Sequence, residues 1–474
     1  MKLKNNIVFT TVITIYVVVT LLRLVFHQPW YDEALAWNIA QQLNLLDIIH
    51  LMRVEGHTFI WYLLLMPFAK ADLWYPYPML FINYIFALGS VIYMWKKAPF
   101  SNFTKIVVTF SFPFFILFPV VARCYSIGVL TLFLLAGLYK DKLKHPIIYS
   151  FLIILCANTS VMALIGASAF GFIFAFDLIN ETLKNNVSKK DFICSFSIMA
   201  AGACLILWQL GGSNSEIQGN GTDFIKNLSE YYISTKPLSN ILAISGSILS
   251  AILLPVYLFR NKKALLFFLY TIGVMLFIFT QIYAGFTHHF VFFFVYALIS
   301  YWICADENPQ NTNLKRATEI AVTLIFLSHI FTFPSTAYVY IHSGSKYFAD
   351  YILNDNNLKN GRIILYYPLD KKVLPYLRKY NTDVWFYCQG EKATYNSALH
   401  DSVICSPKGP KFYVSGWLSK SISKDKTNYS IMKITKETPL EGFIIEDRKR
   451  RIVFELYKDL NKTYGIFKTT EYDK

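Results

Sequence analysis

Apolar and polar positions alternate in long blocks over the first 335 residues. Eleven largely apolar runs, two of them short, are each bounded by polar or charged residues. Because a helix needs about 20 predominantly apolar residues to cross a bilayer, these blocks predict an α-helical polytopic membrane protein with about 11 transmembrane helices. The predicted spans are 7–26, 78–95, 106–121, 125–139, 146–157, 161–178, 192–210, 238–259, 264–283, 289–304 and 317–333.

A further apolar run, 59–69, is too short for a span and is flanked by His57, Lys70 and Asp72. We interpret it as an interfacial or re-entrant helix. With that assignment the lysine-rich loops all fall on the cytoplasmic side, as the positive-inside rule requires. The loops are marked by Lys2/Lys4, Lys96/Lys97, Lys140/Lys142/Lys144, Lys184/Lys189/Lys190, Arg260/Lys262/Lys263 and Lys315/Arg316.

The same parity places three regions outside: the loop 27–77, the polar loop 211–237 and everything after about Pro334. Gln28-Pro29-Trp30 follows the first apolar run, where a cleavable signal would have small residues. We therefore expect the run to remain as an anchor. Residues 1–335 are predicted to form a transmembrane catalytic domain.

The pattern changes after residue 335, where short strand-like runs alternate with helical stretches. Residues 336–474 also carry 23 of the 45 Lys+Arg and 15 of the 30 Asp+Glu. These features predict an extracytoplasmic α/β domain. A disulfide between its two cysteines, Cys388 and Cys405, is one interpretation and two free thiols the other. The expected strands are 362–367, 384–387, 411–414, 442–446 and 452–456, with a helix at 371–380.

Composition agrees with a membrane protein. The 474 residues are 55% hydrophobic, 17% aromatic and 16% charged, with a mean hydropathy of +0.39. Soluble domains carry about 25% charged residues, so disorder, collagen and a water-soluble enzyme are poor interpretations. The net charge of +15 is explained by the basic loops, and no nucleic-acid-binding module accompanies it.

Acidic residues are rare before residue 335, which draws attention to Asp32 and Glu33 just beyond the first span. The residues that follow suit an amphipathic helix at the membrane surface, where Asp32 is either an N-cap or a functional carboxylate. The polar residues predicted on the same face favour a functional role. A carboxylate there can deprotonate a hydroxyl, and the neighbouring cations can stabilise a phosphate leaving group. The polar residues on this outer face are Arg53, Glu55, His57, Arg123, His288 and His289.

Two basic elements have alternative interpretations. Arg123 is the only charge between Lys105 and Lys140; it is either a snorkelling anchor or a phosphate ligand, since its planar fork meets two oxygens at once. His288-His289 either caps a span or donates hydrogen bonds to a phosphate or sugar. Adjacent histidines point in different directions on a helix, so a structural zinc site is not expected. No cofactor is predicted, and dependence on a divalent metal stays open.

These motifs together resemble a known family. An outer-face Asp32-Glu33-Ala34 after the first span, a second motif opening at His57 and continuing to Trp61-Tyr62, many further spans and an outer tail are similar to the GT-C membrane glycosyltransferases. Within them the chain resembles bacterial relatives of the protein O-mannosyltransferases and the lipid A aminoarabinose transferase. Thr58 and Phe59 stand where the family has two prolines. Arg123-Cys124-Tyr125 and Thr287-His288-His289 are weaker matches.

The resemblance implies an inverting glycosyltransferase of the bacterial inner (cytoplasmic) membrane that uses a polyprenyl-phosphate sugar donor and has its C-terminal domain outside. Asp32 would be the base, with Glu33 orienting it or the acceptor. Glu55 and Tyr125 are expected near the sugar or acceptor. The residues expected near the donor phosphate are Arg53, His57, Arg123, His288 and His289.

The sugar and the acceptor, which is a glycan, a lipid or a protein, stay open. Membrane lipids are the expected surroundings and nucleic acid is not an expected partner. A transporter or flippase of lipid-linked sugars is the main alternative, but transporters place ionisable groups near the bilayer midplane, often in inverted repeats. This sequence keeps them at the outer rim and shows no repeat. A scaffold protein with an exported tail is a third interpretation, and it leaves the outer cluster unexplained.

Overall fold

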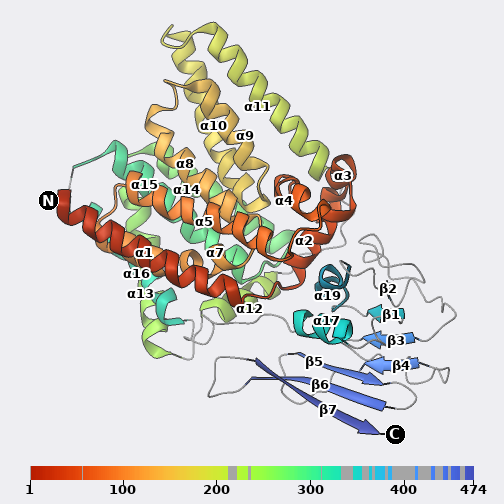
Figure 1. Cartoon of the computed structure of the whole chain (residues 1–474). Helices are drawn as coiled ribbons and strands as arrows, with labels where there is room; N and C mark the ends of the chain where they lie inside the picture. Colours follow the sequence, from red (N-terminus) through yellow and green to blue (C-terminus); the bar gives the residue numbers. More distant parts are fainter. Residues whose placement is uncertain are drawn as a thin grey trace. The chain divides into compact units, whose positions relative to one another are not determined.

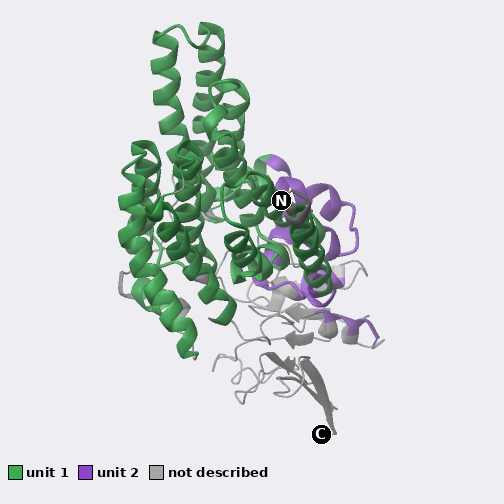
Figure 2. Cartoon of the chain, turned by 90° about the vertical axis from the view of Figure 1, so that its left-hand side faces the viewer, with its two compact units in different colours: residues 1–22, 46–61, 81–334 green, residues 23–45, 62–80, 335–474 purple. Residues whose placement is uncertain are grey.

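The computed structural model divides the chain into two compact units (Figure 2). The first comprises Met1–Leu22, Leu46–Trp61 and Phe81–Pro334; the second comprises Arg23–Leu45, Tyr62–Leu80 and Ser335–Lys474. The segment that carries Asp32 and Glu33 therefore belongs to the same unit as the C-terminal residues. The structure describes residues 2–55, 57–211, 221–232, 236–310, 312–332, 345–354, 362–365, 369–378, 383–386, 411–414, 429–432, 441–446, 450–458 and 465–473.

Helices form the described part of the first unit (Figure 1). Seven described helices are long and apolar enough to cross a membrane, or eight if one bent pair counts as a span, so the chain is a helical, multi-pass membrane protein. These seven are α1 (Lys2–Phe26), α5 (Tyr77–Lys97), α10 (Val161–Leu183), α11 (Lys189–Leu210), α13 (Pro237–Leu258), α14 (Lys262–Gln281) and α15 (Thr287–Glu307). Helix α16 (Asn313–Thr332) has 20 residues but is not one of the seven, and that it crosses a membrane stays a prediction. Shorter ones are α3 (Leu45–Glu55), α8 (Tyr125–Leu138), the 3₁₀ turn η2 (Tyr139–Asp141), α9 (Pro146–Ala157) and α12 (Gly221–Tyr232); α4 (Ile60–Lys70) belongs mostly to the second unit.

The predicted span 106–121 is a bent pair of helices. Helix α6 (Asn102–Phe110) is followed by a π-helical turn η1 (Pro113–Leu117) and a single turn α7 (Phe118–Val120), with an angle of 57° at the break. Ser111 is extended there, and proline at the start of η1 has no N–H to continue the ladder. The Phe118 carbonyl is satisfied by Asn83 Nδ2 at 2.7 Å and Ser126 Oγ at 2.6 Å.

All eleven predicted spans coincide with helices or with this bent pair. Helices α8 and α9 have only 14 and 12 residues, and whether these shorter helices cross a membrane stays a prediction. Small residues let neighbouring helices approach closely, as is common in membranes. A Cβ added to Gly202 of α11 would lie within 3.0 Å of Ile154 on α9, and one added to Gly246 of α13 would lie 2.9 Å from the Ile325 nitrogen of α16.

Two of the basic loops of the first unit share an acidic partner. Lys142 Nζ lies 3.1 Å and Lys263 Nζ 2.6 Å from the carboxylate of Asp177, which ties η2, α10 and α14 together. The Ser101 N–H, at the start of α6, donates a hydrogen bond to Glu319 on α16 at 2.7 Å. Lys142 and Lys263 belong to two of the loops that the positive-inside rule places on the same side of the membrane. Which side of a membrane these loops face stays a prediction.

The second unit is described mainly around three helices. Helix α2 (Tyr31–Gln42) packs against α19 (Leu369–Arg378), and α19 packs against α17 (Ser345–Asn354). Trp37 of α2 is 1% exposed, and Val373 and Leu377 of α19 are fully buried. A hydrophobic face at this spacing is what makes a short helix stable against a partner.

Strands follow in the C-terminal part. Their bounds are β1 (Arg362–Leu365), β2 (Asp383–Phe386), β3 (Lys411–Val414), β4 (Tyr429–Met432), β5 (Glu441–Glu446), β6 (Arg450–Lys458) and β7 (Gly465–Asp473). The first four form a parallel sheet in the order β2-β1-β3-β4, in which Ile363 pairs with Val384 and Phe412, and the last three form an antiparallel sheet. A folded α/β domain over 336–474 stays a prediction.

Several elements were not expected from the sequence. Helix α12 lies inside the predicted polar loop 211–237, and α3, α17, β4 and β7 are likewise additional. Each is short, and α3 and α12 lie in segments that were predicted to be outer loops. The proposed division at residue 335 stays a prediction, and Cys388 and Cys405 lie outside the described residues.

Candidate functional site

Arg123 and His57 meet although they are far apart in the sequence. Arg123 stands in the turn before α8, His57 in the turn before α4, and Arg123 Nη2 lies 3.0 Å from His57 Nε2. Because a guanidinium only donates, His57 Nε2 accepts and the ring proton is on Nδ1. Burial, the charge of Arg123 and the neighbouring His288 lower the pKa of His57 from 6.5 to about 3. His57 is thus a neutral ring at physiological pH.

A second pair, Tyr125 and His289, lies beside the first. The Phe286 N–H donates to His289 Nδ1 at 3.1 Å, so the remaining proton of a neutral His289 is on Nε2. His289 Nε2 lies 3.0 Å from the Tyr125 hydroxyl. Tyr125 and His289 are 3% and 6% exposed, so this hydrogen bond is shielded from water.

Ring contacts join the two pairs into one cluster. The Arg123 guanidinium carbon lies 5.7 Å from the Tyr125 ring centre, and the His57 ring meets Tyr125 edge-on at 6.2 Å. The His288 ring centre is 5.5 Å from Tyr125 and 4.1 Å from His289. We call Arg123, His57, Tyr125, His288 and His289 the Arg-His cluster; Arg123 supplies its fixed positive charge.

The backbone around the cluster is held by polar contacts at helix ends. Gln209, at the end of α11, accepts a hydrogen bond from the Phe59 N–H at 3.1 Å and donates to Asn158 at 2.8 Å. This fixes the segment just after His57. Asn227 of α12 donates to the Gly285 carbonyl at 2.9 Å, and Gly285 has a φ of +74°. That left-handed turn, which favours glycine, sets the entry of α15 and hence the direction of His289.

Two of the predicted site residues, Arg53 and Glu55, lie in the last turn of α3. Arg53 donates from Nε to the Trp208 carbonyl at 3.3 Å. Glu55 is half-buried at the last residue of the helix. Participation of either residue in a phosphate or sugar site stays a prediction.

The acidic pair lies on α2 of the second unit. The Glu33 carboxylate is fully buried, lies 3.0 Å from His27 Nε2 and accepts from the Trp30 N–H at 2.9 Å. The second contact pairs a first-turn acid with an otherwise unsatisfied helix N–H. Asp32, one residue earlier, is half-buried. Glu33 therefore anchors the start of the helix that carries Asp32, and whether Asp32 faces the Arg-His cluster stays a prediction.

The sequence could not announce the residues that position the cluster. Gln209 is a single polar residue at the end of an apolar helix, and Asn227 lies in a segment expected to be a loop. The only signal was their polarity beside apolar neighbours. Among the described residues, no group of three or more His, Cys, Asp or Glu side chains is arranged to hold a metal ion.

The chemistry of the Arg-His cluster suits an anion. Its guanidinium offers several N–H donors, and neutral imidazoles and a phenol add donors without repelling the arginine. A search against models of protein families and against curated proteins finds no match to this chain.

Proposed function

We propose that the protein is an inverting glycosyltransferase that moves a sugar from a polyprenyl-phosphate donor to an acceptor hydroxyl at the outer face of the membrane. The observation that carries the proposal is the Arg-His cluster, in which Arg123 and three histidines from distant segments converge at helix ends. The conjunction of a charged donor and polar rings beside long apolar helices fits a phosphate attached to a lipid.

The protonation pattern supports phosphate as the ligand. His57 Nδ1 is buried, and no described residue accepts its proton. An unmet buried donor costs about 1–3 kcal/mol, which a phosphate oxygen would recover. Arg123 would meet the same phosphate with a charge-assisted pair of hydrogen bonds. Binding of an anion would also raise the pKa of His57, because the anion opposes the charge of Arg123.

The transfer step uses one carboxylate. Asp32 accepts the proton of the acceptor hydroxyl as that oxygen attacks the anomeric carbon. The bond between the anomeric carbon and the phosphate oxygen breaks, and the polyprenyl phosphate leaves with the electron pair. Arg123 and His57 stabilise the developing charge. A single displacement inverts the anomeric configuration, while Glu33 positions Asp32 by holding the first turn of α2.

The finer topology belongs to the same proposal. Residues 336–474 form an α/β domain outside the bacterial cytoplasmic membrane, and all eleven predicted spans cross it. The parallel pairing of β1 with β2, connected through α19, supports an α/β arrangement. The agreement of six basic loops with one cytoplasmic side supports the orientation.

A single-turnover assay tests the proposal. Purified protein is mixed with a polyprenyl-phosphate donor carrying a radiolabelled sugar and with membrane extract as the source of acceptor. Wild type is expected to transfer label, and Arg123→Gln and Asp32→Asn to lose it. Removal of one electrostatic stabiliser costs about 10²–10³ in rate.

Matched controls keep the result specific. Arg260→Gln removes an exposed arginine that contacts Thr312, and Asp47→Asn removes an exposed first-turn acid of α3; both variants are expected to retain transfer. Movement of labelled lipid across vesicles without transfer would instead establish the flippase alternative. Transfer that persists in Arg123→Gln would remove the Arg-His cluster from the mechanism.

A further inference from the structure

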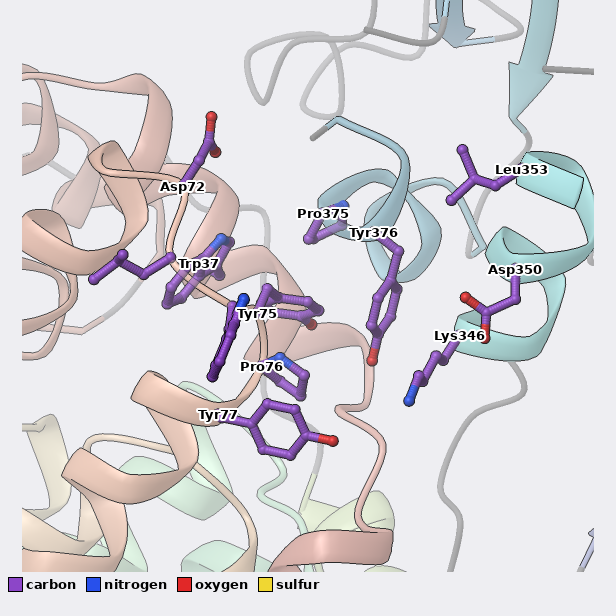
Figure 3. Close-up of a pocket in the computed structure, with 12 residues that line it drawn as sticks. Trp37, Asp72, Tyr75, Pro76, Tyr77, Lys346, Asp350, Leu353, Pro375 and Tyr376 are labelled. Carbon is purple, nitrogen blue, oxygen red and sulfur yellow. The ribbon is translucent and has the colours of Figure 1, made fainter. Parts of the chain in front are cut away.

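A pocket lies within the second unit, formed by segments distant in the sequence (Figure 3). Its walls come from α2, from the turn 72–77 and from helices α17 and α19, and its volume is about 310 Å³. Ligand sites generally measure about 300–1,000 Å³, so this one is at the small end of that range. It has the size of a site for one small unit of a larger ligand.

Aromatic rings dominate the pocket. The ring centres of Trp37 and Tyr75 are 5.3 Å apart, and those of Tyr75 and Tyr376 are 4.8 Å apart with nearly perpendicular planes. Edge-to-face packing of this kind holds rings rigidly. Trp74 and Tyr77, in contrast, are 75% and 47% exposed. Flat, open aromatic faces beside a rigid wall suit a ligand that has an apolar face of its own.

Charged side chains of both signs surround these rings. Lys346 and Asp350 lie one turn apart on α17 and extend toward the side of the pocket formed by Tyr376 (Figure 3). Asp72 lies on the opposite rim and accepts a hydrogen bond from Gln41. The site thus offers an ammonium donor and carboxylate acceptors around aromatic surfaces.

Two phenols at the base of the pocket add to this set. The hydroxyls of Tyr75 and Tyr376 are buried, and neither has a hydrogen-bond partner in the described part of the chain. Burial and the nearby Glu33 carboxylate raise the pKa of Tyr376 above its usual value, and burial, Tyr376 and Glu33 do the same for Tyr75. Both phenols therefore keep their protons and can donate.

This chemistry selects a class of ligand. Two carboxylates against one ammonium disfavour a phosphate or nucleotide. An aromatic cage attracts a quaternary ammonium, but such a group accepts no hydrogen bond and would leave the buried Tyr75 and Tyr376 hydroxyls without a partner. A neutral saccharide meets every feature: its C–H face stacks on an aromatic ring, and its hydroxyls both donate and accept.

The pocket is also close in the chain to the proposed base. Trp37 follows Asp32 by five residues on α2, a separation of about 7.5 Å along a helix axis. We propose that the pocket binds a neutral saccharide unit of the acceptor, while the adjoining part of the acceptor extends around the first turns of α2 to Asp32. The acceptor role rests on the proposed glycosyl transfer, whereas saccharide binding does not.

The test measures binding to the full-length protein in detergent. Saturation-transfer NMR is recorded with a panel of neutral oligosaccharides built from hexoses and N-acetylhexosamines, and with choline and inorganic phosphate as separate probes. We expect at least one oligosaccharide to bind, and Trp74→Ala to weaken it about tenfold, which corresponds to roughly 1.4 kcal/mol. Tyr376→Phe is expected to weaken binding without altering the thermal unfolding midpoint.

Trp208→Ala is the matched control, since Trp208 is 41% exposed in the first unit; it is expected to bind like wild type. Binding of choline or phosphate alone, absence of saccharide binding at about 10 mM, or equal effects of the two tryptophan variants would overturn the proposal. Saccharide binding that depends on Trp74 in a protein without transfer activity would retain the pocket and reject the proposed function.

Discussion

Arg123 Nη2 lies 3.0 Å from His57 Nε2, although 66 residues separate them. The contact fixes the tautomer of His57 and leaves its second nitrogen with a proton to donate. The arginine also keeps the ring neutral, because two positive charges at this distance would repel. The pair therefore favours the binding of an anion and disfavours the binding of a cation.

Acidification is expected to destabilise the protein through His57. Its pKa is about 3 when folded against 6.5 ordinarily, so between these pH values the unfolded chain binds more protons. Stability therefore falls as pH falls from 6.5 toward 3, by up to about 1.4 kcal/mol per pH unit. Thermal unfolding of wild type and His57→Gln between neutral and acidic pH measures this. His57→Gln should lose less stability than the exposed-residue control His145→Gln, and equal losses would contradict the assignment.

Gly285→Ala is expected to displace His289 and to destabilise the first unit by about 1–3 kcal/mol. Gly285 has a φ of +74°, and a Cβ there would lie 2.7 Å from the Phe290 side chain. Gly273→Ala is the control, because a Cβ at that helical position has no neighbour within 4 Å and alanine favours a helix. Chemical denaturation compares the two, and a Gly285→Ala protein as stable as Gly273→Ala would show that the turn tolerates a side chain.

Asp177→Ala is expected to cost about 3–5 kcal/mol, since removal of one partner leaves buried charge uncompensated. The side chains of Asp177 and Lys142 are each 7% exposed. Asp141→Ala removes an exposed pair with Lys144, whose side chain is 73% exposed, and should cost far less than Asp177→Ala because water screens the pair. Unfolding midpoints in a denaturing detergent give the comparison; similar losses in both variants would argue against a structural ion triad.

Substitutions of Glu33 and Asp32 are expected to have different effects on stability and activity. Glu33→Ala removes the contacts with His27 and the Trp30 N–H, so it should lower both the unfolding midpoint and transfer, with about 0.5–2 kcal/mol from the lost helix-start contact alone. Asp32→Asn should lower kcat and leave the midpoint unchanged. Transfer and thermal unfolding are measured on the same preparations. Full transfer activity in a destabilised Glu33→Ala protein would detach the start of α2 from catalysis.

Much of the site was predictable as residue types and little of it as contacts. A charge in an apolar run carries information because it is costly in a membrane, which is why Arg123 and the histidine pair stood out. The role of Glu33 was less accessible, since a buried anchor and a catalytic acid have the same sequence signature. Tyr125 was expected near a sugar or acceptor, which stays a prediction, and its hydrogen bond to His289 could not be foreseen from the sequence.

The sequence by itself determined the helical membrane character and the approximate position of each long helix, because hydrophobic length is a local property that survives without tertiary contacts. Only the tertiary structure decided that His57, Arg123 and His289 converge, that α2 packs with α19 in one unit, and that Trp37, Tyr75 and Tyr376 share a pocket. Such convergence depends on helix packing between distant segments, where small residues such as Gly202 and the turn at Gly285 set distances. No periodicity in a single segment records that geometry.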